Sequence, residues 1–379
     1  MNSDLVETIA DAVLYEGYIL YPYRPSAVKN QQRWNFGALC PPSYSVAQGG
    51  TESIHMRTEC LLETGPETVL EVKIRFLHLL TREVGEIIAD CRSPIAECGH
   101  LTVGPSDSHF RLVPEFNVNG KLLQTWQEAV ERDVSLTPFR LHELYEPQRL
   151  PFSFPGSKEF EILRDEKDRR IVGVVVRTQQ AVAGMVELRI ANCELGNETD
   201  EESSEQYDSS QRALGDRQLF KLTVEITNTT TLAEAGQSSR DEALMRSLVS
   251  THTILCVRGG EFVSLLDPPA AYREFASGCR NVGTYPVLVG DDGSRNCMLS
   301  SPIILYDYPQ IAPESAGNLY DGTEIDEILT LRILSLTDEE KREMRGADDR
   351  ARQILERTET LPMEQLMKMH SAMKGVNRK

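Results

Sequence analysis

Two carboxylates near the end of the chain, Asp307 and Glu314, are the residues whose type and surroundings best suit chemistry. Tyr306 and Tyr308 flank Asp307, and prolines follow it. Prolines fix φ and hold neighbouring side chains in set directions. A pair of carboxylates held in this way can act as general acid and base in hydrolysis, including the hydrolysis of glycosides. The sequence therefore offers Asp307 and Glu314 as candidate catalytic residues of a hydrolase, with a tyrosine orienting the substrate.

An aromatic and basic string near the start of the chain suits recognition better than catalysis. Tyr, Trp and Arg are the residues enriched at binding hot spots. The string is cationic, so it can face a protein partner, or it can dock on Asp307 and Glu314 and tie the two ends of the chain together. The predicted binding residues are Tyr18, Tyr21, Tyr23, Arg24, Lys29, Arg33 and Trp34, joined by Tyr306 and Tyr308 of the later string.

The nearest approach to a metal site is the group Cys91, Cys98 and His100, with His109 downstream. Thiolate and imidazole suit zinc, which takes four ligands in structural sites. The spacing between the two cysteines is not that of a zinc knuckle or ribbon, and the stretch has the composition of a loop. We expect no metal site and no cofactor.

Nucleophilic catalysis has no supporting motif. His142 beside Glu143 and His252 between two threonines are possible bases, but a G-x-S-x-G elbow is missing. His252 lies in a predicted strand, where a histidine is more often a structural residue. Neither G-x-x-x-x-G-K nor G-x-G-x-x-G occurs, so phosphate-binding loops of the known kinds are not expected.

Composition and charge exclude several classes of protein. The 379 residues carry a formal charge of −18, which argues against a general nucleic-acid binder because phosphate binding needs a basic surface. No run of about 18 apolar residues is present, so no membrane span is expected. The acidic N-terminus lacks the features of a secretory signal. We therefore expect a cytoplasmic protein, and in that compartment the eight scattered cysteines should be reduced thiols.

Alternating apolar residues predict antiparallel strands at 69–76, 186–190 and 220–226, and a nearly continuous β-branched run predicts another strand at 171–176. A further segment, 253–266, reads as a hairpin that turns at Gly259-Gly260. Several short strands with turns between them favour a two-layer sandwich. The segment 196–216 is rich in Glu, Asp, Ser and Gln and is expected to be a disordered acidic loop.

Capping residues predict the helices. Residues 4–15 form a helix after Ser3, and Thr125 with Glu128 forms a capping box that opens a short helix through Val130. Similar boxes start helices at Ser239 and at Thr337, and the last helix begins at Pro362. A break is expected near Gly346.

The predicted fold class is α+β, with a central antiparallel β-sandwich, an N-terminal mixed region and a C-terminal helical segment. The corresponding domains are residues 1–150, an N-terminal α+β region; 151–300, the β-sandwich; and 301–379, the helical segment.

Distinctive strings in the chain resemble a family of uncharacterised bacterial proteins encoded beside [NiFe]-hydrogenases and their maturation genes. The resemblance covers most of the chain and implies no catalytic residues. It is carried by Leu14-Tyr15-Glu16-Gly17-Tyr18, Tyr21-Pro22-Tyr23-Arg24, Arg33-Trp34-x-Phe36-Gly37, Ser250-Thr251-His252-Thr253-Ile254-Leu255, Leu265-Leu266-Asp267-Pro268-Pro269, Ser301-Pro302-Ile303-Ile304-Leu305-Tyr306-Asp307-Tyr308-Pro309 and Asp321-Gly322-Thr323-Glu324-Ile325-Asp326-Glu327.

The resemblance implies an accessory or assembly protein for a [NiFe]-hydrogenase, which acts by binding a hydrogenase subunit or a maturation factor. Two alternatives stay open. One is the hydrolase that uses Asp307 and Glu314, and the other is a small-molecule-binding β-sandwich module. An enzyme requires the two carboxylates in one concave pocket, whereas a binding protein requires an exposed aromatic surface.

Overall fold

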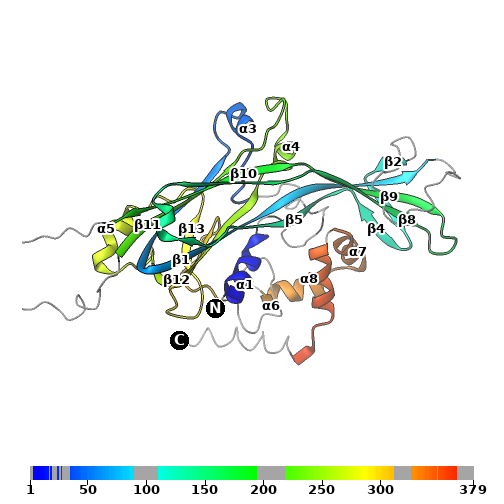
Figure 1. Cartoon of the computed structure of the whole chain (residues 1–379). Helices are drawn as coiled ribbons and strands as arrows, with labels where there is room; N and C mark the ends of the chain where they lie inside the picture. The colour runs from blue at the N-terminus through cyan, green and yellow to red at the C-terminus, as the bar shows by residue number, and fades with distance from the viewer. Residues whose placement is uncertain are drawn as a thin grey trace, which may run out of the picture.

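The computed structural model describes residues 3–16, 18, 24, 27, 35–88, 110–193, 218–310, 326–347 and 349–364. Most of this part of the chain is antiparallel sheet, with short helices around it (Figure 1). The strands are β1 His55–Ile87, β2 Phe110–Val113, β3 Glu115–Val118, β4 Lys121–Gln124, β5 Trp126–Ser135, β6 Phe139–Arg140, β7 Gln148–Phe154, β8 Ser157–Arg164, β9 Ile171–Gln179, β10 Val182–Asn192, β11 Gln218–Asn228, β12 Val249–Val263, β13 Tyr285–Leu288 and β14 Cys297–Ser301. The helices are α1 Ser3–Leu14, α3 Pro42–Ala47, η2 Leu141–Leu144, α4 Arg240–Leu244, η4 Ala270–Tyr272, α5 Arg273–Ser277, α6 Asp326–Leu334, α7 Asp338–Ala347 and α8 Asp349–Glu359.

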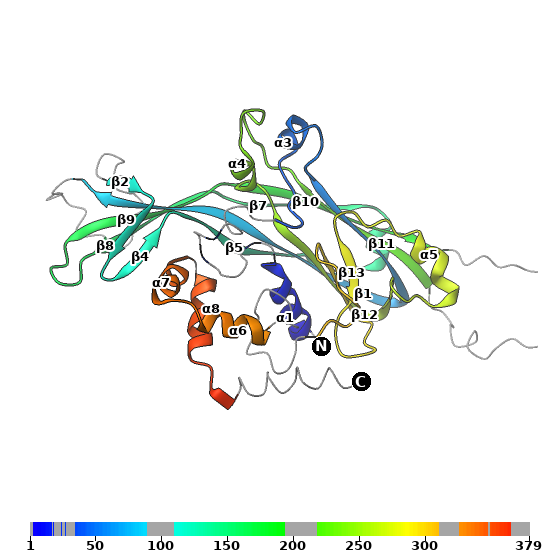
Figure 2. The same ribbon diagram turned by 180° about the vertical axis from the view of Figure 1, so that it is seen from behind.

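One long strand organises the sheet. β1 runs for 33 residues and pairs in succession with β11, β12, β5, β6, β9 and β2. Its alternating residues Leu70, Val72, Ile74 and Phe76 are all buried, as the pattern of the sequence predicts. Because so many strands pair with it, β1 joins one end of the molecule to the other (Figures 1 and 2).

The sheet curls, and its two flanks pack on each other through aromatic side chains. All described strands except β3 and β4 belong to this one sheet. The ring of Phe76 in β1 lies 6.0 Å from that of Phe152 and 5.7 Å from that of Phe154, both in β7. Arg132 of β5 stacks over Phe154 with 4.8 Å between the guanidinium carbon and the ring centre. A continuous core of apolar side chains fills the curl.

Helices lie on both sides of the sheet. Helices α1, α6, α7 and α8 lie on one side, and α3 and α4 lie on the opposite side (Figures 1 and 2). Helix α1 buries Val6, Ile9, Ala10 and Val13, which recur at helical spacing, against β13 and β14. The predicted helix over 4–15 is therefore confirmed.

Charged contacts hold α1 and α7 on the sheet. Arg75 of β1 is only 6% exposed and binds Asp11 of α1 at 2.6 Å as well as Asp133 and Glu131 of β5 at 3.0 and 3.2 Å. Arg82 donates to the backbone oxygen of Gly346 at the end of α7, at 2.7 Å. A side chain at position 346 would lie 2.4 Å from the Leu122 oxygen of β4, so this close approach needs glycine.

The predicted helix at residues 125–130 is wrong. Residues 126–135 form β5, whose ten residues all pair with β1. The hydroxyl of Thr125 donates to the Val113 oxygen at 3.0 Å and does not cap a helix. A full ladder of backbone hydrogen bonds with β1 therefore outweighs the local preference of a capping box.

The predicted hairpin at Gly259-Gly260 is also wrong. Strand β12 runs from Val249 to Val263 without a turn, and Gly259 has φ of +75° at a shift of register opposite residues 64–69 of β1. A Cβ atom on Gly260 would lie 2.7 Å from the Glu63 oxygen. Gly259 lies at a β-bulge, and Gly260 allows two strands to approach closely. A pair of glycines in a sequence is compatible with these features as well as with a turn.

Other predicted elements are confirmed. The predicted strands fall in β1, β9, β10 and β11. The capping boxes at Ser239 and Thr337 both form, with Glu242 and Glu340 as the acidic partners, and α7 and α8 meet near Gly346. The predicted acidic loop, 196–216, lies outside the described residues, as does most of the helix expected after Pro362.

The structure has no bearing on whether the predicted domains fold separately, so the boundaries at 150 and 300 stay a prediction. Strand β1, in the first predicted domain, pairs with β9, β11 and β12 in the second.

In the described ranges, no helix is both long enough and apolar enough to cross a bilayer.

Candidate functional site

Asp307 is a fixed part of the sheet edge. Its Oδ2 accepts a hydrogen bond from the Ser264 hydroxyl at 2.5 Å, and its Oδ1 accepts one from the Leu288 amide of β13 at 2.8 Å. The next amide, that of Tyr308, donates to the Leu288 oxygen at 2.8 Å. The carboxylate therefore attaches the segment after β14 to the exposed edge of β13, which is a structural use of both of its oxygens.

Tyr306 stands out from this edge into solvent. The side chain of Tyr306 is 85% exposed and that of Ile304 is 73% exposed. Between and beside them, Ile303 and Leu305 pack against the core under α1, so alternate residues of the segment point inward and outward. We call Ile304 and Tyr306 the apolar edge surface.

Tyr308 has a different environment from Tyr306. It is partly buried against the main core and has φ of +56°, an uncommon conformation for a residue with a side chain. Burial, with the nearby Asp307 carboxylate, raises the pKa of the Tyr308 hydroxyl above its ordinary value. Tyr308 therefore serves the packing of the segment, while Tyr306 is free to meet a partner.

The described residues of the N-terminal string are internal contacts. Tyr18 is 2% exposed, and its hydroxyl donates to the Gln127 oxygen at 2.9 Å. Arg24 pairs with two acids of α7, Glu340 at 3.1 Å and Glu343 at 3.6 Å. The string thus joins the start of the chain to the C-terminal helices. The other candidate residues, Tyr21, Tyr23, Lys29, Arg33 and Trp34, lie outside the described residues, as do Glu314, Cys91, Cys98, His100 and His109.

His252 forms a serine–histidine pair that has no access to substrate. Its Nδ1 donates to the Ser250 oxygen at 2.7 Å, and its Nε2 accepts from the Ser301 hydroxyl at 3.1 Å. Both side chains are 0% exposed. Burial, with a smaller effect of Arg75, lowers the pKa of His252 to about 4. The pair has the hydrogen bond of a nucleophilic dyad but holds two strands together, as expected for a structural histidine.

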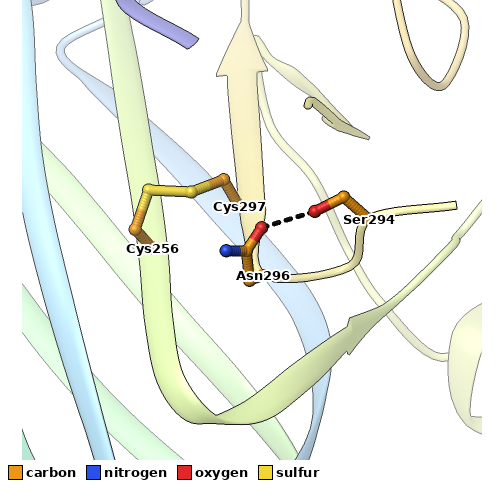
Figure 3. Close-up of a disulfide and its surroundings, with 4 residues drawn as sticks. All are labelled: Cys256, Ser294, Asn296 and Cys297. Atoms are coloured by element: carbon orange, nitrogen blue, oxygen red, sulfur yellow. Dashed lines mark hydrogen bonds between the residues drawn. A yellow bond between two sulfur atoms is a disulfide. The ribbon is translucent and has the colours of Figure 1, made fainter. Parts of the chain in front are cut away.

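Two of the cysteines are joined, so the expectation of eight reduced thiols is wrong for them. Cys256 of β12 and Cys297 of β14 lie directly opposite each other in the ladder, with 4.2 Å between their Cα atoms, and form a disulfide (Figure 3). Opposed positions on paired antiparallel strands bring two Cβ atoms within bonding reach. Cys40, Cys60, Cys193 and Cys279 are free thiols. Over the ranges the structure describes, no group of histidines, cysteines and acids is arranged to hold a metal ion.

A cavity of about 540 Å³ lies where β5 meets the ends of β8 and β9 and the helix α8. Its walls include Tyr15, Arg132, Gln179 and Arg350. A second cavity of about 420 Å³ adjoins it and shares Glu128 and Arg177. Both volumes fall in the range that holds small ligands. Asp307 is in neither cavity.

Glu128 lines both cavities and pairs with two arginines. Its carboxylate accepts from Arg82 at 2.8 Å and from Arg177 at 2.9 Å. Arg177 also binds Glu161 at 2.9 Å. This chain of charges joins β1, β5, β8 and β9 and gives the cavity floor a fixed shape.

No protein-family model matches this chain, and no curated protein is similar to it in sequence. The site must therefore be interpreted from its own geometry. Sequence reasoning found Tyr306 and Asp307 but missed the cavity and its residues Arg132 and Gln179. It also missed the pairing of Cys256 with Cys297. The charged residues of this stretch, at 128, 131, 132 and 133, do not alternate with apolar ones, so the sequence carried no strand signal that could have placed these side chains.

Proposed function

We propose that the protein is a non-catalytic accessory or assembly protein for a [NiFe]-hydrogenase, which binds a hydrogenase subunit or a maturation factor. The resemblance of its sequence strings supplies the class of partner. The observation that carries the proposal is the apolar edge surface, because Tyr306 and Ile304 are exposed on a segment whose other residues are fixed by the core. An exposed tyrosine with rigid support costs little conformational entropy on binding.

The proposal also places the protein in the cytoplasm and treats its curled sheet as a β-sandwich. The ring contacts between β1 and β7 support the sandwich, because they cross the curl between strands that are not neighbours in the sheet. In a reducing compartment, Cys256 and Cys297 would be present largely as thiols. Their opposed positions in the ladder accommodate both states.

The experiment is capture of the tagged protein from a host that produces a [NiFe]-hydrogenase, followed by mass spectrometry. The double variant Ile304→Ser, Tyr306→Ser should lose the hydrogenase subunit or maturation factor that the wild type retains. Val46→Ser, in which an apolar side chain that is 79% exposed on α3 is changed, should retain it. Equal capture by all three proteins would refute the proposed surface.

The hydrolase alternative has less support. A general acid or base must exchange a proton with the substrate, whereas both oxygens of Asp307 accept hydrogen bonds from Ser264 and Leu288.

The small-molecule-binding alternative is favoured by one specific observation, the cavity of about 540 Å³ beside β5. It is the second candidate function, and it does not compete with partner binding because the apolar edge surface does not line that cavity.

A further inference from the structure

The two adjoining cavities beside β5, taken together, differ in charge from the rest of the molecule. The chain as a whole has 40 basic and 58 acidic residues. The walls of this cavity and its neighbour together carry seven arginines and lysines against five carboxylates. The cavity beside β5 alone has three arginines against four carboxylates, so an anion would be held there by individual donors and not by an excess of positive charge.

Most of these cations are already neutralised. Arg82 and Arg177 share Glu128. Arg345 pairs with Glu359, and Arg352 pairs with Asp349 at 2.7 Å. These pairs shape the walls and leave little charge for a ligand.

Arg132 differs from these four arginines. No carboxylate of the described ranges forms a salt bridge with it. Its guanidinium is held by neutral groups, with Nη2 donating to Oε1 of Gln179 at 2.7 Å and the ring of Phe154 beneath it. An arginine that is positioned without being neutralised is prepared to receive an anion.

Two donors beside this contact also lack an acceptor. Nε of Arg132 and Nε2 of Gln179 are buried and have no hydrogen-bond partner in the described part of the chain. Gln179 is 7% exposed, and both residues line the cavity. An oxygen atom at the inner end of the cavity would satisfy both donors.

We propose that this cavity binds a small molecule through a carboxylate or phosphate group, which is held by Arg132 and Gln179. Planar guanidinium groups bind the oxygens of both anions in the same way, so either anion fits. This inference rests on the second candidate function and is independent of the apolar edge surface.

The test uses the full chain with inorganic phosphate and with succinate as probes, each against sodium chloride at equal ionic strength. When a probe that binds is at about ten times its Kd, it should raise the thermal midpoint of the wild type by about 2 °C. A shift with phosphate alone identifies a phosphate site, and a shift with succinate alone identifies a carboxylate site.

Variants decide whether the shift comes from this site. Arg132→Gln should abolish it, whereas Arg149→Gln should keep it, because Arg149 is exposed on β7 and pairs with Glu187. If Arg132→Gln fails to fold, Gln179→Leu removes one donor and leaves the arginine, and it should reduce the shift. The double variant Ile304→Ser, Tyr306→Ser should respond as the wild type does, even if it has lost its protein partner.

Three results would overturn the inference. They are the lack of a saturable shift with either probe, a shift that survives in Arg132→Gln, and a crystal structure in the presence of the probes that shows only a water molecule at Arg132 and Gln179.

Discussion

Two buried histidines should make the protein less stable as the pH falls from 7 to 5. His252 is 0% exposed and its pKa is lowered to about 4 by burial, with a further effect of Arg75. His78 of β1 is also 0% exposed, and burial, with a smaller effect of Arg132, lowers its pKa to about 4. Its Nε2 donates to the Gln180 oxygen at 2.8 Å, so the neutral ring is the form that the fold accommodates.

The sign of the effect follows from the lowered pKa values. Above about pH 6.5, both histidines are neutral in the folded and unfolded states. Between about pH 6.5 and 4, the unfolded chain binds protons that the folded protein does not bind, so stability is lost as the pH falls. Each histidine should remove about 2 kcal/mol of unfolding free energy between about pH 7 and 5. The two together remove about 4 kcal/mol, a large part of the stability of an ordinary domain.

The assay is urea unfolding at a series of pH values, followed by circular dichroism. The slope of unfolding free energy against pH should fall by about half in each single variant, His252→Gln and His78→Gln. It should nearly vanish in the double variant. His142→Gln is the matched control, because His142 is exposed in η2, and it should keep the slope of the wild type. A wild-type stability that is flat from pH 7 to 5, or a slope that persists in the double variant, would refute the reasoning.

Three further predictions concern the disulfide, the hydrogen bonds of Asp307 and the ion pairs of Arg24. Replacing Cys256 and Cys297 by alanine should lower the unfolding free energy by up to about 4 kcal/mol, since the disulfide spans 41 residues; reductant should destabilise the wild type and leave the variant unchanged in denaturant titrations. Asp307→Ala removes two hydrogen bonds and should cost about 2 kcal/mol, and a denaturation midpoint equal to that of the wild type would show that the carboxylate is not structural. Arg24→Ala should cost less than about 1 kcal/mol, because its ion pairs are partly exposed. That small loss should shrink further in high salt, which repeats of the titration at two salt concentrations would test.

Local patterns in the sequence were sufficient where neighbours along the chain determine the structure. The alternation from Val69 to Phe76 gave one stretch of β1, and Thr337 with Glu340 capped α7 as expected. Both depend on spacing that the chain itself carries.

Patterns failed where distant strands determine the structure. The segment from Thr125 to Val130 has the sequence of a capping box. Its residues nevertheless form part of β5, because all ten residues of that strand pair with β1. The glycines at 259 and 260 permit positive φ, and only the partner strand decides whether they form a turn or a bulge. The disulfide between Cys256 and Cys297 depends on the register of β12 against β14. Its two cysteines are 41 residues apart in the chain.

The candidate site was predicted in the same uneven way. The exposure of Tyr306 could be expected from its proline-rich surroundings. The contact of Arg132 with Gln179 could not, because it depends on β5 and β9 flanking the same stretch of β1. A single sequence without its fold does not contain that arrangement.

The apolar edge surface should be tested first as the proposed binding site for a hydrogenase subunit or maturation factor. The most direct measurement is the dissociation constant of the purified pair by isothermal titration calorimetry. For the double variant Ile304→Ser, Tyr306→Ser, we expect a Kd at least about tenfold weaker, while Val46→Ser should keep the wild-type value. An unchanged Kd in the double variant, or no measurable binding by the wild type, would contradict the proposal.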